Sequence, residues 1–300
     1  METLHEKADR QAVREVLIHR VRGEEVQLAA DEVAVEEPLE LRLRHVQDGV
    51  ASEQTICVTM RTPGHDVELA VGYLYAEQVI HSLDDLARRP TAELGGGDEA
   101  GILTVEIDTE IGVDVRRLQR NVFTSSSCGV CGTPSLDALA HAACPDLPLP
   151  RPMIDRSVIS MLPEILLAEQ EAFRQTGGLH AAALFEPSGR LLRVREDVGR
   201  HNAMDKLIGS CLLEGVDLTE RIVLVSGRTS YELVQKALVA GIPVLAAVGA
   251  PSSLAVSLAQ AHGLTLLGFV RGTRYNVYHG EERFRSSANR SSLPARPPEP

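Results

Sequence analysis

The sequence predicts an α/β protein in which a large parallel-sheet domain follows a smaller α+β unit. Three continuous apolar runs, at 222–225, 242–248 and 264–270, alternate with helical segments at 230–240 and 252–262. Buried strands that alternate with helices are typical of a parallel sheet covered on both faces. The 300 residues are 44% hydrophobic but only 3% aromatic, so the predicted core is aliphatic.

The first third is expected to pair short strands with one helix. Residues 1–15 are polar and mixed in charge, which predicts a flexible arm. Asp66 is a candidate N-cap for a helix that runs through Tyr75. The α+β unit then covers 16–120, with a turn at Gly23 and with strands predicted from alternating apolar residues at 16–22, 24–34, 39–46, 54–61 and 103–107.

The second domain is predicted to span 121–278. Residues 144–152 form a proline-rich connector, and its prolines exclude both a regular helix and a central strand. Between this connector and the parallel strands, the patterns predict helices at 158–173 and 200–214 and strands at 179–185 and 191–195. Residues 279–300 are polar, with Arg, Ser and Pro and no periodicity, which predicts a disordered tail.

The composition excludes several classes of protein. A net charge of −12 argues against non-specific nucleic-acid binding, which needs clustered Lys and Arg. No run of 18 apolar residues occurs and the N-terminus has no apolar signal core, so we expect a cytoplasmic protein without a membrane span. The odd, sparse set of cysteines indicates reduced thiols and not a disulfide framework: Cys57, Cys128, Cys131, Cys144 and Cys211.

Polar and basic residues follow all three parallel strands, at the edge where open α/β sheets bind ligands. Ser226, Gly227 and Arg228 precede one helix, and Ser252 and Ser253 open the next. Hydroxyls and free N–H groups at helix N-termini favour anions, although such residues are also ordinary helix caps. Two guanidinium groups after the third strand, Arg271 and Arg274, suit phosphate. The edge therefore predicts a site for a phosphate-bearing ligand, with His201 nearby as a base or an orienting donor.

Cys128 and Cys131 stand three residues apart in a run of serines and glycines, Ser125–Gly132. A structural zinc would need four ligands, and the sequence has no second Cys-x-x-Cys motif or His pair. A deaminase-type zinc would need an upstream His-x-Glu motif, which is also missing. Dithiol redox chemistry and sulfur carriage as a persulfide both stay open, and either is favoured over a bound metal.

Taken together, the motifs resemble the FdhD family of formate dehydrogenase accessory sulfurtransferases. The resemblance covers nearly all of residues 20–275. It rests on Arg61–Gly64 with Glu68–Ala70, Ser127–Gly132, Thr176–Ala182, Glu196–Lys206, Ser226–Arg228, Gly241–Pro243, Ala250–Ser253 and Gly268–Gly272. As an ordered set these motifs are highly specific.

The resemblance implies a cytidine-deaminase-like, three-layer α/β/α C-terminal domain and usually a homodimer. Such proteins take persulfide sulfur from a cysteine desulfurase and deliver it to the molybdenum (or tungsten) bis-guanylyl pyranopterin cofactor, for insertion into formate dehydrogenase. The resemblance places the persulfide on the Cys-x-x-Cys motif, and we expect Cys128 to carry it with the help of Cys131. No permanently bound metal is expected. Cofactor contacts are implied on Phe269, Val270, Arg271, Gly272, Thr273 and Arg274. The alternative is a cofactor-binding scaffold whose Cys-x-x-Cys motif holds a metal.

Overall fold

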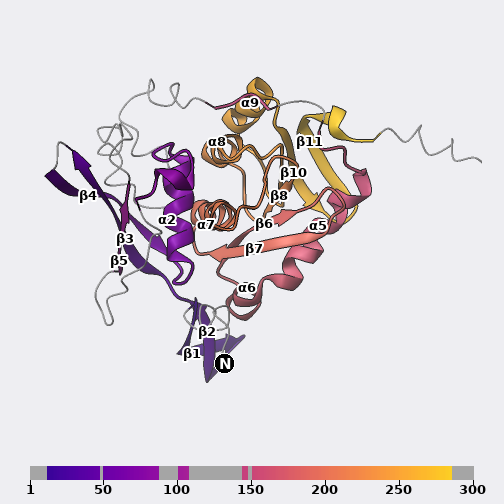
Figure 1. Ribbon diagram of the computed structural model, residues 1–300. Coiled ribbons are helices and arrows are strands. Elements are labelled where there is room, and N and C mark those ends of the chain that lie inside the picture. The colour runs from indigo at the N-terminus through magenta and orange to yellow at the C-terminus, as the bar shows by residue number, and fades with distance from the viewer. Residues whose placement is uncertain (1–11, 48–49, 88–100, 108–143, 148–150, 286–300) are drawn as a thin grey trace, which may run out of the picture.

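The computed structural model describes residues 12–47, 50–87, 101–107, 144–147 and 151–285. These residues form three β-sheets, of two, three and six strands, together with the helices that pack on them (Figure 1). The predicted mixed α/β class is therefore confirmed, whereas the deaminase-like arrangement stays a prediction. The predicted domain boundary at residue 120 and the Cys-x-x-Cys motif lie outside the described residues.

The six-stranded sheet has the order β11-β10-β9-β8-β6-β7. Strands β8, β9 and β10 run parallel, as the three apolar runs predict, and the other neighbours pair antiparallel. The strands are β6 (His180–Phe185), β7 (Leu191–Asp197), β8 (Ile222–Val225), β9 (Val244–Ala247), β10 (Thr265–Arg271) and β11 (Arg274–His279). Because β6 is antiparallel to β8, it begins at the edge where β8, β9 and β10 end.

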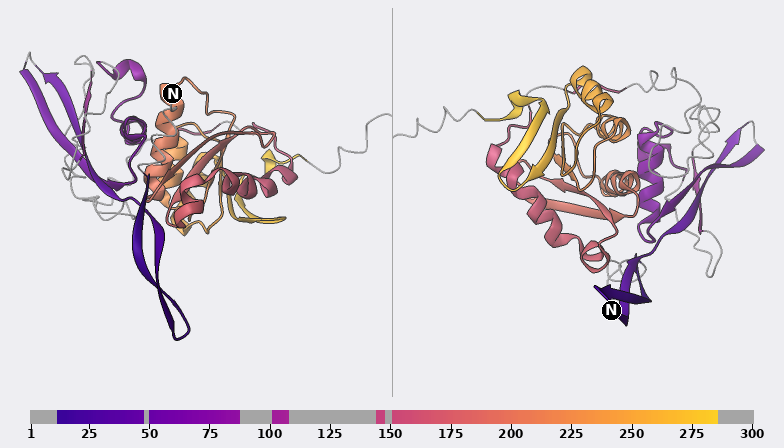
Figure 2. Two further views of the ribbon diagram at one scale, coloured as in Figure 1. Left: turned by 90° about the horizontal axis from the view of Figure 1, so that it is seen from below. Right: turned by 180° about the vertical axis from the view of Figure 1, so that it is seen from behind.

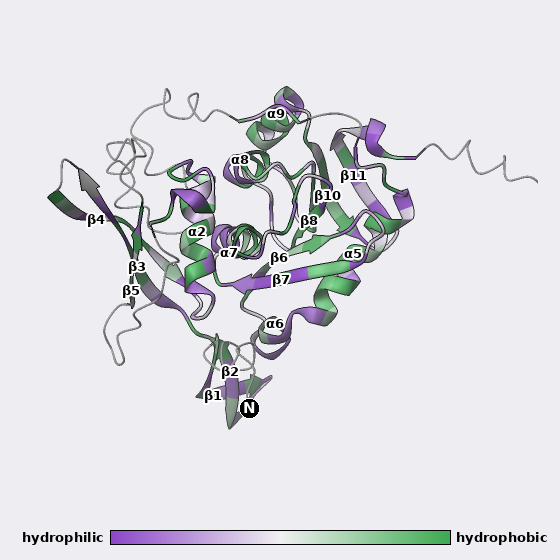
Figure 3. Ribbon diagram, in the orientation of Figure 1, coloured by the Kyte–Doolittle hydropathy of each residue, from purple (hydrophilic) through white to green (hydrophobic). Residues whose placement is uncertain are grey.

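Helices cover both faces of this sheet. Helices α7 (Arg200–Leu213), α8 (Tyr231–Val239) and α9 (Ser253–His262) pack on one face, and α5 (Arg156–Glu169) packs on the other. Neighbouring residues of each central strand point into the two different cores, so these strands are apolar along their whole length (Figure 3). Serine caps begin α8 and α9, since Ser230 Oγ accepts from Leu233 N and Ser252 Oγ accepts from Ala255 N.

The smaller unit pairs β3 (Glu37–Gln47) antiparallel with β4 (Val50–Arg61) and parallel with β5 (Gly101–Glu106). Its helix α2 (Asp66–Ala76) lies between this sheet and α7 (Figure 1). A helix enclosed on two sides needs apolar or small residues around most of its surface. Leu69 and Leu74 accordingly pack in the core of the smaller unit, and Gly72 faces α7. A short 3-10 helix, η1 (Leu83–Asp85), follows.

Strands β1 (Val13–Arg22) and β2 (Glu25–Ala34) form a separate hairpin that turns at Gly23, where φ is 62°. Its base packs on α6 (Glu171–Thr176) through Val13, Ala34 and Phe173. The predicted flexible arm, residues 1–15, therefore extends too far along the chain. Strand β1 already begins at Val13, and Val13 pairs with Ala34.

Two predicted helix details are wrong. Asp66 does not cap α2, because its carboxylate pairs with Arg61 at 2.9 and 3.0 Å; the left-handed His65 precedes the helix instead. The helix predicted at 158–173 is two helices that break at Gln170. The carboxylate of Glu196 accepts hydrogen bonds from the second and third residues of α6, which stabilises a new helix N-terminus there.

The predicted tail begins too early. Strand β11 reaches His279, and the 3-10 helix η4 (Glu281–Arg283) follows it. The buried Arg283 guanidinium donates to Arg151 O at 2.9 Å and to Gly263 O at 3.1 Å, so it satisfies one carbonyl group before α5 and one at the end of α9. These two long-range hydrogen bonds hold residues 279–285 against the rest of the domain.

Candidate functional site

The carboxyl ends of β8, β9 and β10 lie on one edge of the six-stranded sheet, together with the start of β6 and the N-terminus of α7. The predicted residues Ser226, Gly227, Arg228 and Ser252 therefore follow neighbouring strands. His201 joins them from the first turn of α7. The topology thus brings most of the predicted ligand residues to one edge.

Backbone hydrogen bonds join the two loops after β8 and β9. Gly249 N donates to Gly227 O at 3.0 Å, and Ser252 N donates to Thr229 O at the same distance. A Cβ at Gly249 would lie 2.8 Å from Gly227 O, so this close approach requires glycine. Ser226 uses both its N–H and its hydroxyl on Ala181 of β6. Several predicted donors are consequently part of the loop framework.

The hydroxyl and guanidinium side chains of these loops differ in their surroundings. Ser230 and Ser252 cap their helices, as the ordinary interpretation of such serines predicts. Arg228 and Ser253 are exposed at the edge. The buried Thr229 hydroxyl has no hydrogen-bond partner among the described residues. A buried polar group without a hydrogen-bond partner costs free energy. The Thr229 hydroxyl is therefore available for a hydrogen bond with a ligand or a water molecule.

His201 lies largely buried behind these loops. Its Nε2 is 3.0 Å from Ser230 Oγ and 3.2 Å from a carboxylate oxygen of Glu232. Burial, and the nearby charges of Arg200 and Lys236, lower the pKa of His201 to about 3. The imidazole is therefore neutral near pH 7, and the two facing oxygens place its proton on Nε2.

We expect His201 to make the protein less stable in acid. An unfolded chain protonates this imidazole near pH 6.5, whereas the folded chain protonates it only near pH 3. Stability is therefore lost as the pH falls from about 6.5, at up to about 1.4 kcal/mol per pH unit. Urea unfolding of the wild type and of His201→Gln between pH 7 and pH 4 measures this, and parallel stability curves for the two would contradict it.

The turn between β10 and β11 carries the remaining predicted residues. Arg271, Gly272, Thr273 and Arg274 are all exposed there, whereas Val270 is fully buried in the core, so its side chain serves packing. Phe269 is 43% exposed and has a φ of 56°, a left-handed conformation that is rare for an aromatic residue. Strained residues are concentrated at functional sites, so the exposed ring is a candidate ligand contact.

The described cysteines are poor nucleophiles. Cys57 and Cys211 are buried, and burial raises the pKa of Cys57 to about 12. Burial also raises the pKa values of Cys144 and Cys211. Since a thiolate is the reacting species, Cys128 and Cys131 are the candidates that remain. Among the residues with described positions, no group of three or more His, Cys, Asp or Glu side chains is placed to hold a metal ion, and no helix has the length and apolarity to cross a membrane.

A buried polar network that the sequence analysis did not predict joins the two units around Thr62. Thr62 N donates to Asp197 at 3.1 Å, and Lys206 Nζ donates to Thr62 O at 2.8 Å. Lys206 also pairs with Asp197 at 2.7 Å, and both side chains are buried. The signal in the sequence was the density of charged residues at 61–68 and 195–206, but spacing alone does not pair them.

Glu68 and Arg195 add a second link between the units. Arg195 donates from two nitrogens to the Glu68 carboxylate. Burial opposes ionisation of Glu68, but hydrogen bonds from Arg195 and His65 outweigh it and lower the pKa of Glu68 to about 2. Residues 61–68 and 195–206 therefore supply the polar contacts that hold the two units together.

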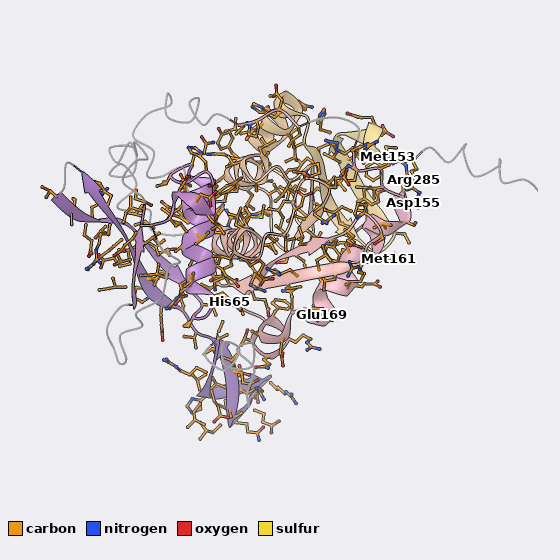
Figure 4. The ribbon with its side chains drawn as sticks, viewed as in Figure 1. His65, Met153, Asp155, Met161, Glu169 and Arg285 are labelled. Atoms are coloured by element: carbon orange, nitrogen blue, oxygen red, sulfur yellow. The ribbon has the colours of Figure 1, made fainter. Side chains whose placement is uncertain are left out.

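A cavity of about 480 Å³ lies beside this network. It is lined by β7, by Thr62 and Lys206, and by His65 and Glu169, which Figure 4 labels. None of the predicted site residues lines it, so the cavity is separate from the sheet edge.

Replacing Asp197 with alanine is expected to destabilise the protein by about 3–5 kcal/mol, because Lys206 would keep an uncompensated buried charge. Asp197→Asn retains an acceptor for Thr62 N and should cost less. Glu186→Ala is the matched control, since it removes an exposed ion pair with Arg190 and should cost at most about 1 kcal/mol. Chemical denaturation measures all three, and equal losses for Asp197→Ala and Glu186→Ala would contradict the prediction.

Fold and site together define an α/β protein whose sheet edge presents hydroxyls, helix N-termini and arginines. The model of the FdhD/NarQ family matches residues 34–285, and the chain belongs to this family. It is 46% identical over 271 residues to "Sulfur carrier protein FdhD" of Streptomyces avermitilis, covering 88% of this chain and 93% of that protein. The protein of the same name from Sulfurisphaera tokodaii is 42% identical over 272 residues, with 90% and 98% covered.

A solved structure supports the fold. The crystal structure of a formate dehydrogenase accessory protein from Desulfotalea psychrophila matches with a TM-score of 0.65 and 24% identity. The match covers 91% of this chain and all of the other. At this level of identity the likeness concerns the fold.

Proposed function

We propose that this protein is a sulfur carrier that accepts persulfide sulfur from a cysteine desulfurase and transfers it to the molybdenum (or tungsten) bis-guanylyl pyranopterin cofactor needed by formate dehydrogenase. The observation that carries this proposal is the 42–46% identity to proteins named as sulfur carriers, over most of both chains. The buried state of Cys57 and Cys211 supports it, because it leaves the Cys-x-x-Cys motif as the better source of a reactive thiolate.

The proposed chemistry needs both thiols of the motif. The Cys128 thiolate attacks the outer sulfur of the donor's cysteine persulfide, the donor's S–S bond breaks, and the donor leaves as a thiolate. Cys131 then attacks the Cys128-bound inner sulfur, so the pair closes to a disulfide and the outer sulfur leaves as hydrosulfide for the cofactor. Cys131 supplies the electron pair, and a dithiol reductant reopens the disulfide for the next cycle.

The sheet edge is the proposed place of the cofactor cargo. Its two pyrophosphates suit the exposed guanidinium groups of Arg228, Arg271 and Arg274. The Phe269 ring offers a flat apolar surface for a guanine base. His201 is buried next to the Ser230 cap, so its role is to hold the loop after β8 in place.

The partners follow from the same proposal. They are a cysteine desulfurase, the catalytic subunit of formate dehydrogenase and a second copy of this chain, all in the cytoplasm. The net charge of −12 supports the expectation that nucleic acid is not a partner.

Sulfur loading tests the proposal. The full chain is incubated with a desulfurase and cysteine and then digested with trypsin under non-reducing conditions. Cys128, Cys131 and Cys144 stay in one peptide, because no Lys or Arg lies between Arg120 and Arg151. Fragment ions must therefore place the added sulfur atom, which we expect on Cys128. A sulfur adduct confined to other cysteines, or a stoichiometric metal that blocks loading, would contradict the proposal.

A further inference from the structure

Glu232 places a carboxylate against His201 at the start of α8. Its side chain is 25% exposed, and among the described residues it pairs with His201 and with no lysine or arginine. The ammonium group of Lys236, one turn further along α8, is already paired with Asp205 at 2.8 Å. Burial raises the pKa of Glu232 and the charge of Glu77 adds to this, so the ionised carboxylate costs free energy. Charges that are kept at such a cost are concentrated at functional sites.

The arrangement of Glu232, His201 and Ser230 differs from that of a Ser-His-acid triad. In such a triad the serine meets one nitrogen of the imidazole and the carboxylate meets the other. Here Ser230 Oγ and the Glu232 oxygen both face Nε2 of His201, at 3.0 and 3.2 Å. The imidazole therefore does not connect the serine to the carboxylate through its ring, and Ser230 is not an activated nucleophile.

The charge of Glu232 decides which way the hydrogen bond between His201 and Ser230 runs. A carboxylate oxygen 3.2 Å from Nε2 attracts an N–H group there and repels a lone pair. Nε2 therefore donates to Ser230 Oγ, which also accepts from Leu233 N. Because both lone pairs of this oxygen are then used, the hydroxyl hydrogen of Ser230 is left for another acceptor.

This hydroxyl belongs to the candidate ligand edge. Ser230 is partly exposed at the N-terminus of α8, and it directly follows Thr229, whose buried hydroxyl has no partner among the described residues. Two successive hydroxyls at a helix N-terminus suit the oxygen atoms of a phosphate group. We propose that Glu232 is a positioning residue, which sets the direction of the His201–Ser230 hydrogen bond and so keeps the Ser230 hydroxyl available to a phosphate-bearing ligand. The inference rests on the proposed function and adds a residue to its cargo site.

Histidine NMR of the full chain tests the direction of the bond without a ligand. With isotope-labelled histidine at about pH 8, where imidazole is neutral, two-bond proton–nitrogen spectra show which ring nitrogen is protonated. A His201→Gln variant identifies the signal. The wild type should carry the proton on Nε2, whereas Glu232→Ala should shift it toward Nδ1, because Ser230 then donates to Nε2. Glu169→Ala is the matched control, since Glu169 is an exposed residue of α5, on the other face of the sheet from α8 (Figure 2).

Binding of guanosine diphosphate, measured by calorimetry, tests the consequence for a ligand. Charge alone predicts that Glu232→Ala binds this anion more tightly, because a carboxylate repels phosphate. The positioning role predicts the opposite: Glu232→Ala should raise the dissociation constant at least about threefold, and Ser230→Gly at least about tenfold. Glycine is tolerated at an N-cap, so the second variant keeps α8. In the Ser230→Gly background, Glu232→Ala should no longer weaken binding, since it acts through the missing hydroxyl.

The same His201 signal in the wild type and in Glu232→Ala overturns the proposal. Tighter binding by Glu232→Ala, or an equal loss of affinity with and without the Ser230 hydroxyl, overturns it as well. If Glu232→Ala unfolds, Glu232→Gln is the second probe; its amide accepts or donates, so both tautomers and an intermediate affinity are expected. A tautomer that depends on Glu232 in a protein that does not bind guanosine diphosphate supports the positioning role and counts against the proposed cargo alone.

Discussion

Replacing Cys128 with serine is expected to lower the rate of sulfur loading by at least about 100-fold. The reacting species is a thiolate, and a serine hydroxyl is not ionised near neutral pH and forms no persulfide. The described cysteines do not substitute, because burial raises the pKa values of Cys57, Cys144 and Cys211. Mass spectrometry of the variant after incubation with a desulfurase measures the loss.

Two serine variants serve as controls. Cys144→Ser should load like the wild type, since this thiol is half-buried and shifted away from ionisation. Cys131→Ser should keep the adduct on Cys128 but release hydrosulfide at least about tenfold more slowly, because the resolving thiol is lost. If Cys131 is the carrier, the results for Cys128→Ser and Cys131→Ser exchange. Full loading of both variants would contradict the assignment to this motif.

Replacing Gly209 with alanine is expected to destabilise the protein by about 3 kcal/mol or more, at the upper end for overpacking. A Cβ at Gly209 would lie 1.9 Å from Glu68 O and 2.7 Å from Gly72 N. Both are backbone atoms of α2, so α2 and α7 must separate to admit the methyl group. Alanine favours an isolated helix by roughly 1 kcal/mol over glycine, so the measured loss underestimates the steric cost.

Gly72→Ala should have a similar effect, because its Cβ would lie 1.9 Å from Asp205 O of α7. The double variant should lose less than the sum of the single losses, since one separation of the helices relieves both contacts. Gly178→Ala is the control, because its nearest neighbour would be Ala34 Cβ at an ordinary 3.5 Å. Denaturant unfolding of the four proteins measures these effects, and a neutral Gly209→Ala variant would contradict them.

Local patterns predicted much of the fold. The runs at 222–225, 242–248 and 264–270 are apolar on both sides because helices cover both faces of their sheet, so their parallel pairing was predictable. Ser230 and Ser252 cap their helices with their own hydroxyls, a contact within three residues that the sequence shows directly. Because these parallel strands end at one edge of the sheet, the residues that follow them lie together there. Much of the candidate ligand site was therefore predictable as well.

Contacts between distant residues were not predictable in this way. The helix break at Gln170 depends on a carboxylate of β7, and the ordered segment 279–285 depends on the carbonyl groups that Arg283 meets. Val270 lies within the predicted ligand stretch but points into the core, because side chains alternate along β10. The Cys-x-x-Cys motif lies outside the described residues, so its role stays a proposal.

The hydrogen bond from Lys206 to Thr62 O also has a consequence for synthesis in the cell. The two residues are 144 positions apart. At about 5–20 residues per second, a ribosome needs roughly 7–30 s to add the chain that separates them. During that time Thr62 and the buried face of α2 are without α7 and remain open to chaperones and proteases. Slow translation of this stretch should therefore reduce the yield of folded protein more than equally slow translation after Lys206.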